Sequence, residues 1–95
     1  MNADLNKKIQ ELCEQSGITY AGMFGSFSRG DFNEKSDVDL LVNYSYPLSL
    51  LEKGSLIVKL EALFGRDVDL VSAKNVKNNR KSFIMKDLKT IYEKR

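Results

Sequence analysis

The amino-acid sequence predicts an α/β fold in which a mixed β-sheet of about four strands is flanked by helices, within a single domain at residues 1–95. Two observations lead to this prediction. Short apolar runs typical of strands alternate with segments whose apolar residues recur at helical spacing. Hydrophobic residues also make up 42% of the 95 residues, which is enough for the core of one small domain.

The first half of the chain predicts one helix and two strands. Asp4 is typical of a helix N-cap, and Gly17 is typical of a helix end. Residues 18–24 and 38–44 are apolar runs with the length of strands. The apolar stripe of the helix, where we expect the single cysteine to be a core residue, consists of Leu5, Ile9, Leu12 and Cys13.

The second half of the chain predicts two more helices and two more strands. A leucine-rich helix ends at Gly65, and a later basic helix has Phe83 and Ile84 as its expected core contacts. The expected ranges are a helix at 50–64, a strand at 67–71, a helix at 76–86 and a strand at 89–92.

The composition excludes several kinds of chemistry. Because the chain has no histidine, it cannot form a Ser-His-Asp or Cys-His catalytic group, and a structural zinc site is not expected. One cysteine excludes an internal disulfide. Catalysis would therefore depend on carboxylates, amines, hydroxyls or a hard metal ion.

The hydropathy and charge patterns suggest a cellular location and possible binding partners. No apolar run approaches the roughly 18 residues that a membrane span needs, and the polar N-terminus is unlike a signal peptide, so we expect a cytoplasmic protein. Residues 74–95 are strongly basic, whereas residues 1–73 are acidic on balance. This basic tail could contact phosphates or an acidic partner, or it could simply be a solvated, lysine-rich surface.

Two aspartates mark the entry to the second predicted strand. Alternate strand residues share a face, so Asp37 and Asp39 point the same way and Val38 points to the core. Two close carboxylates repel each other, and a divalent cation relieves that repulsion; Mg²⁺ prefers such hard oxygen ligands. A third acid on a neighbouring strand, either Asp67 or Asp69, would complete a two-metal site for displacement at phosphorus.

A glycine- and serine-rich loop precedes the acid pair. Gly25 allows the backbone to approach a phosphate, and Ser26 can donate its hydroxyl. A short turn or helix is expected at residues 27–30, and the backbone N–H groups at its start can bind an anion. Arg29 could add a positive charge to the phosphate. Its alternative partners are two acidic side chains, Asp31 and Glu34. The glycine spacing excludes both a Walker A motif and a dinucleotide-binding fingerprint.

These residues carry a family resemblance. The segment GSFSRGDFNEKSDVDLLV, residues 25–42, resembles the signature of the minimal nucleotidyltransferases of the DNA polymerase beta superfamily. GRDVDLV, residues 65–71, resembles the strand that bears that family's third carboxylate, and IYEK, residues 91–94, resembles its last strand. The matching signature residues are Gly25, Ser26, Arg29, Gly30, Ser36, Asp37, Asp39 and Leu40.

The resemblance implies a palm-like nucleotidyltransferase fold and transfer of a nucleoside monophosphate from an NTP with release of pyrophosphate. By the family pattern, Asp37 and Asp39 hold both of two Mg²⁺ ions. Asp69 holds the catalytic ion and helps to deprotonate the acceptor hydroxyl, whereas Asp67 stands at the strand entrance. Gly25 and Ser26 bind the triphosphate.

The resemblance also implies an acceptor. Larger members carry a further domain that binds the acceptor, and this chain has no residues left for one, so we expect another macromolecule to present it. Small members act as antitoxins that transfer AMP from ATP to a tyrosine of a HEPN-type ribonuclease toxin. The alternatives are an enzyme with a small-molecule or RNA acceptor and a non-catalytic binding module. A nucleic acid partner is less expected, because the basic residues lie away from the site.

Overall fold

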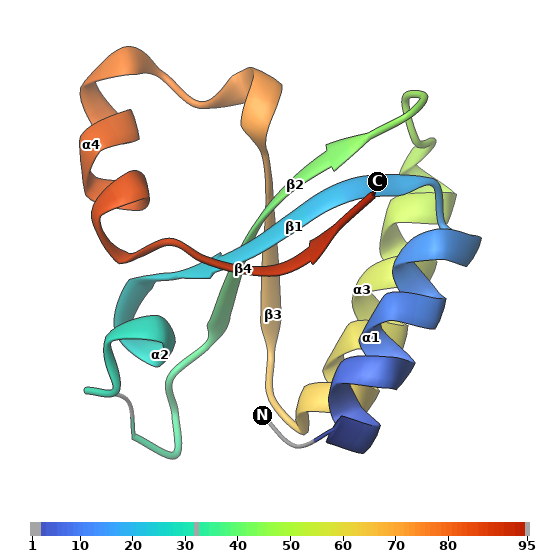
Figure 1. The fold of residues 1–95 in the computed structure, drawn as a ribbon, viewed down its shortest axis with the longest axis horizontal. Helices are drawn as coiled ribbons and strands as arrows, with labels where there is room; N and C mark the ends of the chain where they lie inside the picture. Colours follow the sequence, from blue (N-terminus) through green and yellow to red (C-terminus); the bar gives the residue numbers. More distant parts are fainter. Residues whose placement is uncertain (1–2, 32, 95) are drawn as a thin grey trace.

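The computed structural model describes residues 3–31 and 33–94 and shows a four-stranded sheet with helices on both of its faces (Figure 1). Its strands are β1 (Ile18–Phe24), β2 (Val38–Tyr44), β3 (Val68–Ser72) and β4 (Lys89–Glu93). They lie in the order β3-β2-β1-β4. β1 is antiparallel to both β2 and β4, whereas β2 and β3 are parallel, so the predicted mixed sheet is confirmed.

The helices connect the strands as the sequence pattern predicts. They are α1 (Ala3–Gln15), α2 (Gly25–Arg29), α3 (Leu50–Phe64) and α4 (Asn78–Asp87), with a short 3-10 turn, η1 (Ala73–Asn75), before α4. The crossover α3 joins the parallel strands β2 and β3, which a tight hairpin turn cannot join. Among the described residues, no helix combines the length and the apolar character needed to cross a membrane.

α1 and α3 lie side by side on one face of the sheet, and α4 lies on the other (Figure 1). Strand alternation divides the side chains of β2 between these faces. The α1–α3 face contains the main core, which includes Ile9, Cys13, Val38, Leu40, Val42, Leu56 and Leu60. The α4 face contains a smaller cluster of Phe24, Leu41 and Ile84. Cys13 is 1% exposed, so its predicted place in the core is confirmed.

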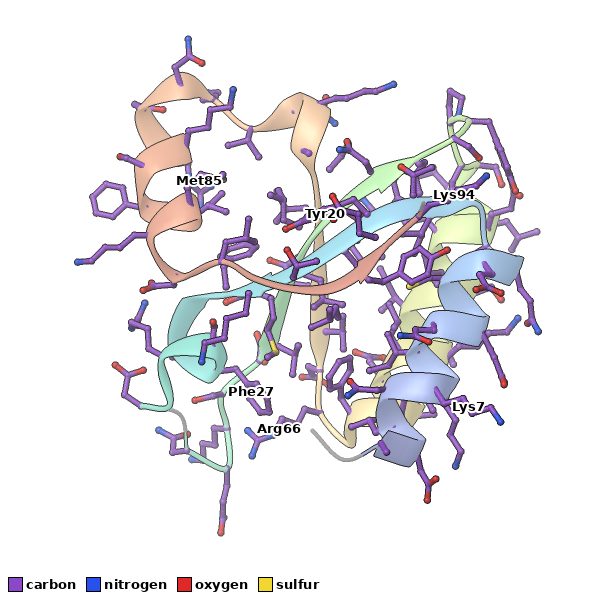
Figure 2. All side chains as sticks on the ribbon, in the orientation of Figure 1. Lys7, Tyr20, Phe27, Arg66, Met85 and Lys94 are labelled. Atoms are coloured by element: carbon purple, nitrogen blue, oxygen red, sulfur yellow. The ribbon has the colours of Figure 1, made fainter. Side chains whose placement is uncertain are left out.

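The sequence prediction was wrong about one core contact. Ile84 is buried, but Phe83 is 76% exposed. Neighbouring residues on a helix point about 100° apart, so a short helix that packs only a narrow side on the sheet can bury Ile84 and leave Phe83 in solvent. Met85, on the other side of Ile84, is 58% exposed (Figure 2).

Several predicted element ends differ from the structure. Asp4 lies in the first turn of α1 rather than before it, where a carboxylate still interacts favourably with the helix dipole. α2 begins at Gly25, two residues before the predicted turn or helix. The 3-10 turn η1 and the extended Val76 delay α4 by two residues. β3 begins at Val68, so Asp67 precedes the strand.

Candidate active site

The site is built where β1 turns into α2. Phe24 is extended and Gly25 follows with φ of +79°, a conformation that glycine adopts without steric strain. A Cβ atom at Gly25 would collide with a carboxylate oxygen of Asp39 on β2. The local turn and this close approach both require glycine, and together they place the first residues of α2 against Asp39.

β2 and β3 bring two of the predicted acids together. Asp39 and Asp69 are direct partners in the parallel register, so their side chains emerge next to each other on the same face. Asp37 immediately precedes β2 and is exposed, as is Asp69, whereas Asp39 is half-buried. The structure thus pairs Asp39 with Asp69, and Asp37, just before β2, is close enough for its charge to act on Asp39.

The pKa of Asp39 records this arrangement. Burial raises the pKa of Asp39 above its usual value, and the negative charges of Asp69 and Asp37 raise it further. Desolvation and like charges both disfavour the ionised carboxyl group. A cation among the three groups would act in the opposite direction, because it would stabilise their ionised forms.

Asp67, the other candidate for the third carboxylate, occupies a different place. It lies just before β3, and its backbone carbonyl accepts a hydrogen bond of 2.9 Å from the N–H of Val38. Its side chain is exposed. This backbone bond aligns the entrances of β2 and β3, which supports the register that pairs Asp69 with Asp39.

The donor set fits a hard divalent cation. Within residues 3–31 and 33–94, no three His, Cys, Asp or Glu side chains converge closely enough to form a ready-made metal site. Nevertheless, after burial, the negative charges of Asp69 and Asp37 help to raise the pKa of Asp39, so these groups interact electrostatically. Carboxylate oxygens on adjacent strands are suitable Mg²⁺ ligands, and substrate phosphates commonly complete the coordination of this ion.

Arg29, at the end of α2, forms ion pairs within the protein. Its side chain lies 3.2 Å from Asp31 and 2.8 Å from Asp87 at the end of α4. The hydrogen bonds to Asp87 and then to Asp31 raise the pKa of Arg29. The predicted alternative partner Asp31 is therefore a real contact. A role of Arg29 toward phosphate stays a prediction.

The attachment of α2 to α4 was not predicted from the sequence. The buried hydroxyl of Ser28 donates a hydrogen bond to the backbone carbonyl of Asp87, the same residue that pairs with Arg29. Ser28 lies between Ser26 and Arg29 in the motif, but only the fold shows that its partner is 59 residues away. Both contacts attach α2 to the end of α4.

Comparison with known proteins places the chain among nucleotide-transfer domains. The family described as "Nucleotidyltransferase domain" matches residues 5–91. A relative from Thermococcus cleftensis, named "Protein adenylyltransferase MntA", is 39% identical over 79 residues; the match covers 83% of this chain and 80% of the relative.

Two solved structures have similar folds. One, described as a candidate minimal nucleotidyltransferase, is 31% identical with a TM-score of 0.75, over 88% of this chain and 86% of that one. The other is a chain in the complex of the tri-AMPylated Shewanella oneidensis HEPN toxin with its MNT antitoxin. It has a TM-score of 0.70 and 22% identity, over 98% of this chain and 73% of that one, and at this identity it shows the fold alone.

Proposed function

The chain belongs to the nucleotidyltransferase family, and we propose that it transfers AMP from ATP, with Mg²⁺, to a tyrosine hydroxyl of a HEPN-type toxin, for which it serves as the antitoxin. One observation carries the catalytic part of this proposal. Asp39 and Asp69 are register partners beside Asp37, and the glycine that begins α2 lies against Asp39. The acids therefore lie next to the backbone segment that we propose binds phosphate.

In the proposed site, Asp37 and Asp39 would hold both of two Mg²⁺ ions, and Asp69 would hold the catalytic one. Bound Mg²⁺ supplies charge neutralisation of the triphosphate and polarisation of its α-phosphate. Burial raises the pKa of Asp39 most, and the charges of Asp69 and Asp37 raise it further; a bound cation would offset this repulsion, which supports the assignment.

The backbone N–H groups of Gly25 and Ser26 begin α2, and the first N–H groups of a helix point away from its own carbonyls. In our proposal they bind the triphosphate together with the hydroxyl of Ser26, and Gly25 allows the close approach. Arg29 already pairs with Asp31 and Asp87, so we assign it first to holding α2 and only second to charge near the phosphates.

The proposed reaction is an in-line displacement at the α-phosphorus. The acceptor oxygen forms a bond to this phosphorus while the bond to the bridging oxygen of the β-phosphate breaks, and pyrophosphate leaves with that electron pair. Asp69 helps to remove the proton of the acceptor hydroxyl. Asp69 is exposed, so an acceptor side chain can reach it.

Two findings support a protein acceptor. The T. cleftensis relative is named a protein adenylyltransferase, and the S. oneidensis complex holds an AMPylated HEPN toxin. We further propose that the basic surface of α4, with the exposed Phe83 and Met85, meets the partner, because α4 lies on the same sheet face as Asp39. The proposed setting of this reaction is the cytoplasm.

The test mixes the purified chain, MgATP and the product of the neighbouring gene, and weighs that product by intact mass spectrometry. We expect one or more AMP additions. Asp37→Asn and Asp39→Asn should abolish them, because each removes a proposed metal ligand with little change in side-chain volume. Asp67→Asn is the matched control and should retain transfer.

Two other results would contradict the proposal. A complex that neutralises the partner without a mass change, and equally well with both aspartates replaced, would identify a non-catalytic binding module. AMP transfer to added RNA or to a small molecule, with none to the protein, would identify the enzyme as acting on another acceptor.

A further inference from the structure

Arg66 connects three separate segments of the chain near the acids. It follows Gly65, which ends α3 with φ of +68°, and precedes β3. Its Nη1 donates hydrogen bonds of 2.7 Å to the carbonyl of Asn33 and 3.1 Å to the carbonyl of Ser36. Its guanidinium lies 5.1 Å from the ring centre of Phe27 on α2, and Figure 2 shows these two side chains together.

The two carbonyls belong to a tight turn at residues 33–36. The N–H of Ser36 donates to the carbonyl of Asn33 at 3.1 Å, and the hydroxyl of Ser36 accepts from the N–H of Asn33 at 2.9 Å. The amide oxygen of Asn33 also accepts from the N–H of Lys35 at 2.8 Å. The turn therefore has its own internal bonds, and the two hydrogen bonds of Arg66 attach it to the segment before β3.

The position of this turn determines the position of a proposed metal ligand. Asp37 directly follows Ser36, and Phe27 directly follows Ser26 in α2. We propose that Arg66 is a positioning residue that fixes the turn at 33–36 to α2, and thereby fixes Asp37 relative to the triphosphate-binding end of α2. This inference rests on the proposed function.

The geometry also explains why arginine occupies this position. A planar guanidinium can stack on an aromatic ring through its face while its edge donates to carbonyl oxygens. An ammonium group is a compact charge, so lysine could keep the charge near Phe27 but would hold the two carbonyls less well. Methionine could fill similar space but donates no hydrogen bond.

The first experiment measures hydrogen exchange at the amide of Ser36 and needs neither nucleotide nor acceptor. In Arg66→Met, we expect this amide to exchange about 10-fold faster, as the loss of one typical hydrogen bond would allow. Arg66→Lys should give an intermediate rate. The amide of Ser45, bonded to the carbonyl of Gly17 at 2.8 Å at the far end of β2, reports on the rest of the fold and should not change.

The second experiment measures Mn²⁺-dependent ATP affinity by calorimetry and the separate values of kcat and KM. Arg66→Met should weaken metal-dependent affinity by about 10- to 100-fold, the usual effect of removing a support behind metal ligands. Lys7→Met is the charge-matched control; Lys7 is exposed on α1, which lies across the sheet from α4 (Figure 2).

The two measurements separate this inference from the proposed function. Unchanged Ser36 exchange in Arg66→Met would overturn the inference, as would unchanged Mn²⁺–ATP affinity in a wild type that binds both. A wild type that binds no ATP would contradict the proposed function, and the exchange rate would still decide whether Arg66 holds the turn. Equal acceleration at Ser36 and Ser45 would show general destabilisation and would also overturn it.

Discussion

The strand β2 contributes side chains to both faces of the sheet, and the two sets differ in role: one packs the core, and the other includes a candidate metal ligand. On the α1–α3 face, Val38, Leu40 and Val42 of β2 are 0%, 1% and 0% exposed. On the other face, the same strand presents Asp39 and then the buried Leu41 beneath α4. The apolar residues of β2 are packed completely on one face, and this packing fixes the backbone of the strand. Asp39 alternates with them along the same backbone, so the packing also fixes the position of this carboxylate on the other face.

Burial has a different chemical result on each face. On the α1–α3 face, called the covered face below, burial raises the pKa of Cys13 to about 12, so the thiol stays neutral and serves as an apolar core residue. On the α4 face, called the open face below because it presents Asp39, burial raises the pKa of Asp39, and the charges of two more acids raise it further. The neutral thiol of Cys13 is therefore stable in the apolar core, whereas the carboxylates around Asp39 repel one another, and a bound cation could relieve that repulsion.

The largest expected effect is on the open face. Asp69→Asn should reduce AMP transfer by at least about 10²- to 10³-fold, comparable with the removal of one preorganised electrostatic group in an active site. Its free energy of unfolding should change by no more than about 0.5 kcal/mol, because Asp69 is exposed. Single-turnover transfer and urea unfolding measure the two quantities.

Asp67→Asn is the control for that change, since Asp67 carries the same side chain two residues earlier. It should transfer AMP at a rate close to the wild type. Loss of activity in Asp67→Asn with a tolerated Asp69→Asn would show that the wrong acid of this pair has been assigned to the metal site.

The covered face should respond in the opposite way. Leu60→Ala removes a side chain that is 1% exposed and should lower the free energy of unfolding by about 2–5 kcal/mol, while the folded protein keeps its ATP affinity. Val58→Ala on the same helix is the control; Val58 is 65% exposed, so its change should be within about 0.5 kcal/mol. Equal losses in the two variants would contradict the described packing of α3.

A pair of glycines tests how closely the start of α2 approaches Asp39 on β2. Gly25 and Gly30 have φ of +79° and +85°, so an alanine at either position should lower stability by about 1–2 kcal/mol. The added Cβ meets Asp39 only at Gly25, whereas nothing lies within 4 Å of it at Gly30. Gly25→Ala should therefore also weaken MgATP binding, by about 10-fold or more, in calorimetry. Equal MgATP affinities in the two variants would show that Gly25 does not contribute to nucleotide binding.

The last prediction concerns the pH dependence of stability that Cys13 contributes. Its pKa is about 12 in the folded chain and roughly 8.5 when unfolded, so between these values the unfolded state binds fewer protons. Stability from this group is complete below about pH 8.5 and declines as the pH rises toward 12. The stability advantage of the wild type over Cys13→Ala should shrink over this range in urea titrations. A constant advantage would mean that the thiol is not desolvated.

The sequence predicted the parts of the molecule that depend on neighbours along the chain. β1 and β2 have the expected bounds, because each is an apolar run flanked by turn residues. The prediction that Asp37, Asp39 and Asp69 lie near one another agrees with the electrostatic coupling in the structure, although their roles remain predictions.

Contacts between distant segments could not be read in the same way. Arg29 pairs with Asp87, 58 residues away, and nothing near either residue in the sequence indicates that choice. Arg66 is one charged residue among many, and its bonds to the turn at 33–36 require the whole crossover of α3. Phe83 and Ile84 are adjacent apolar residues, so only the packing of α4 decides which of them is buried.

The attachment of α2 to α4 has a consequence for how the molecule opens. Ser28 and Arg29 both bind Asp87, so a fluctuation that lifts α4 from the sheet must also break the bonds that hold α2. We therefore expect the two helices to open together in local unfolding, although they are far apart in the chain. A ligand that holds one helix should then slow the opening of the other, which would link the proposed nucleotide site thermodynamically to the proposed partner surface on α4.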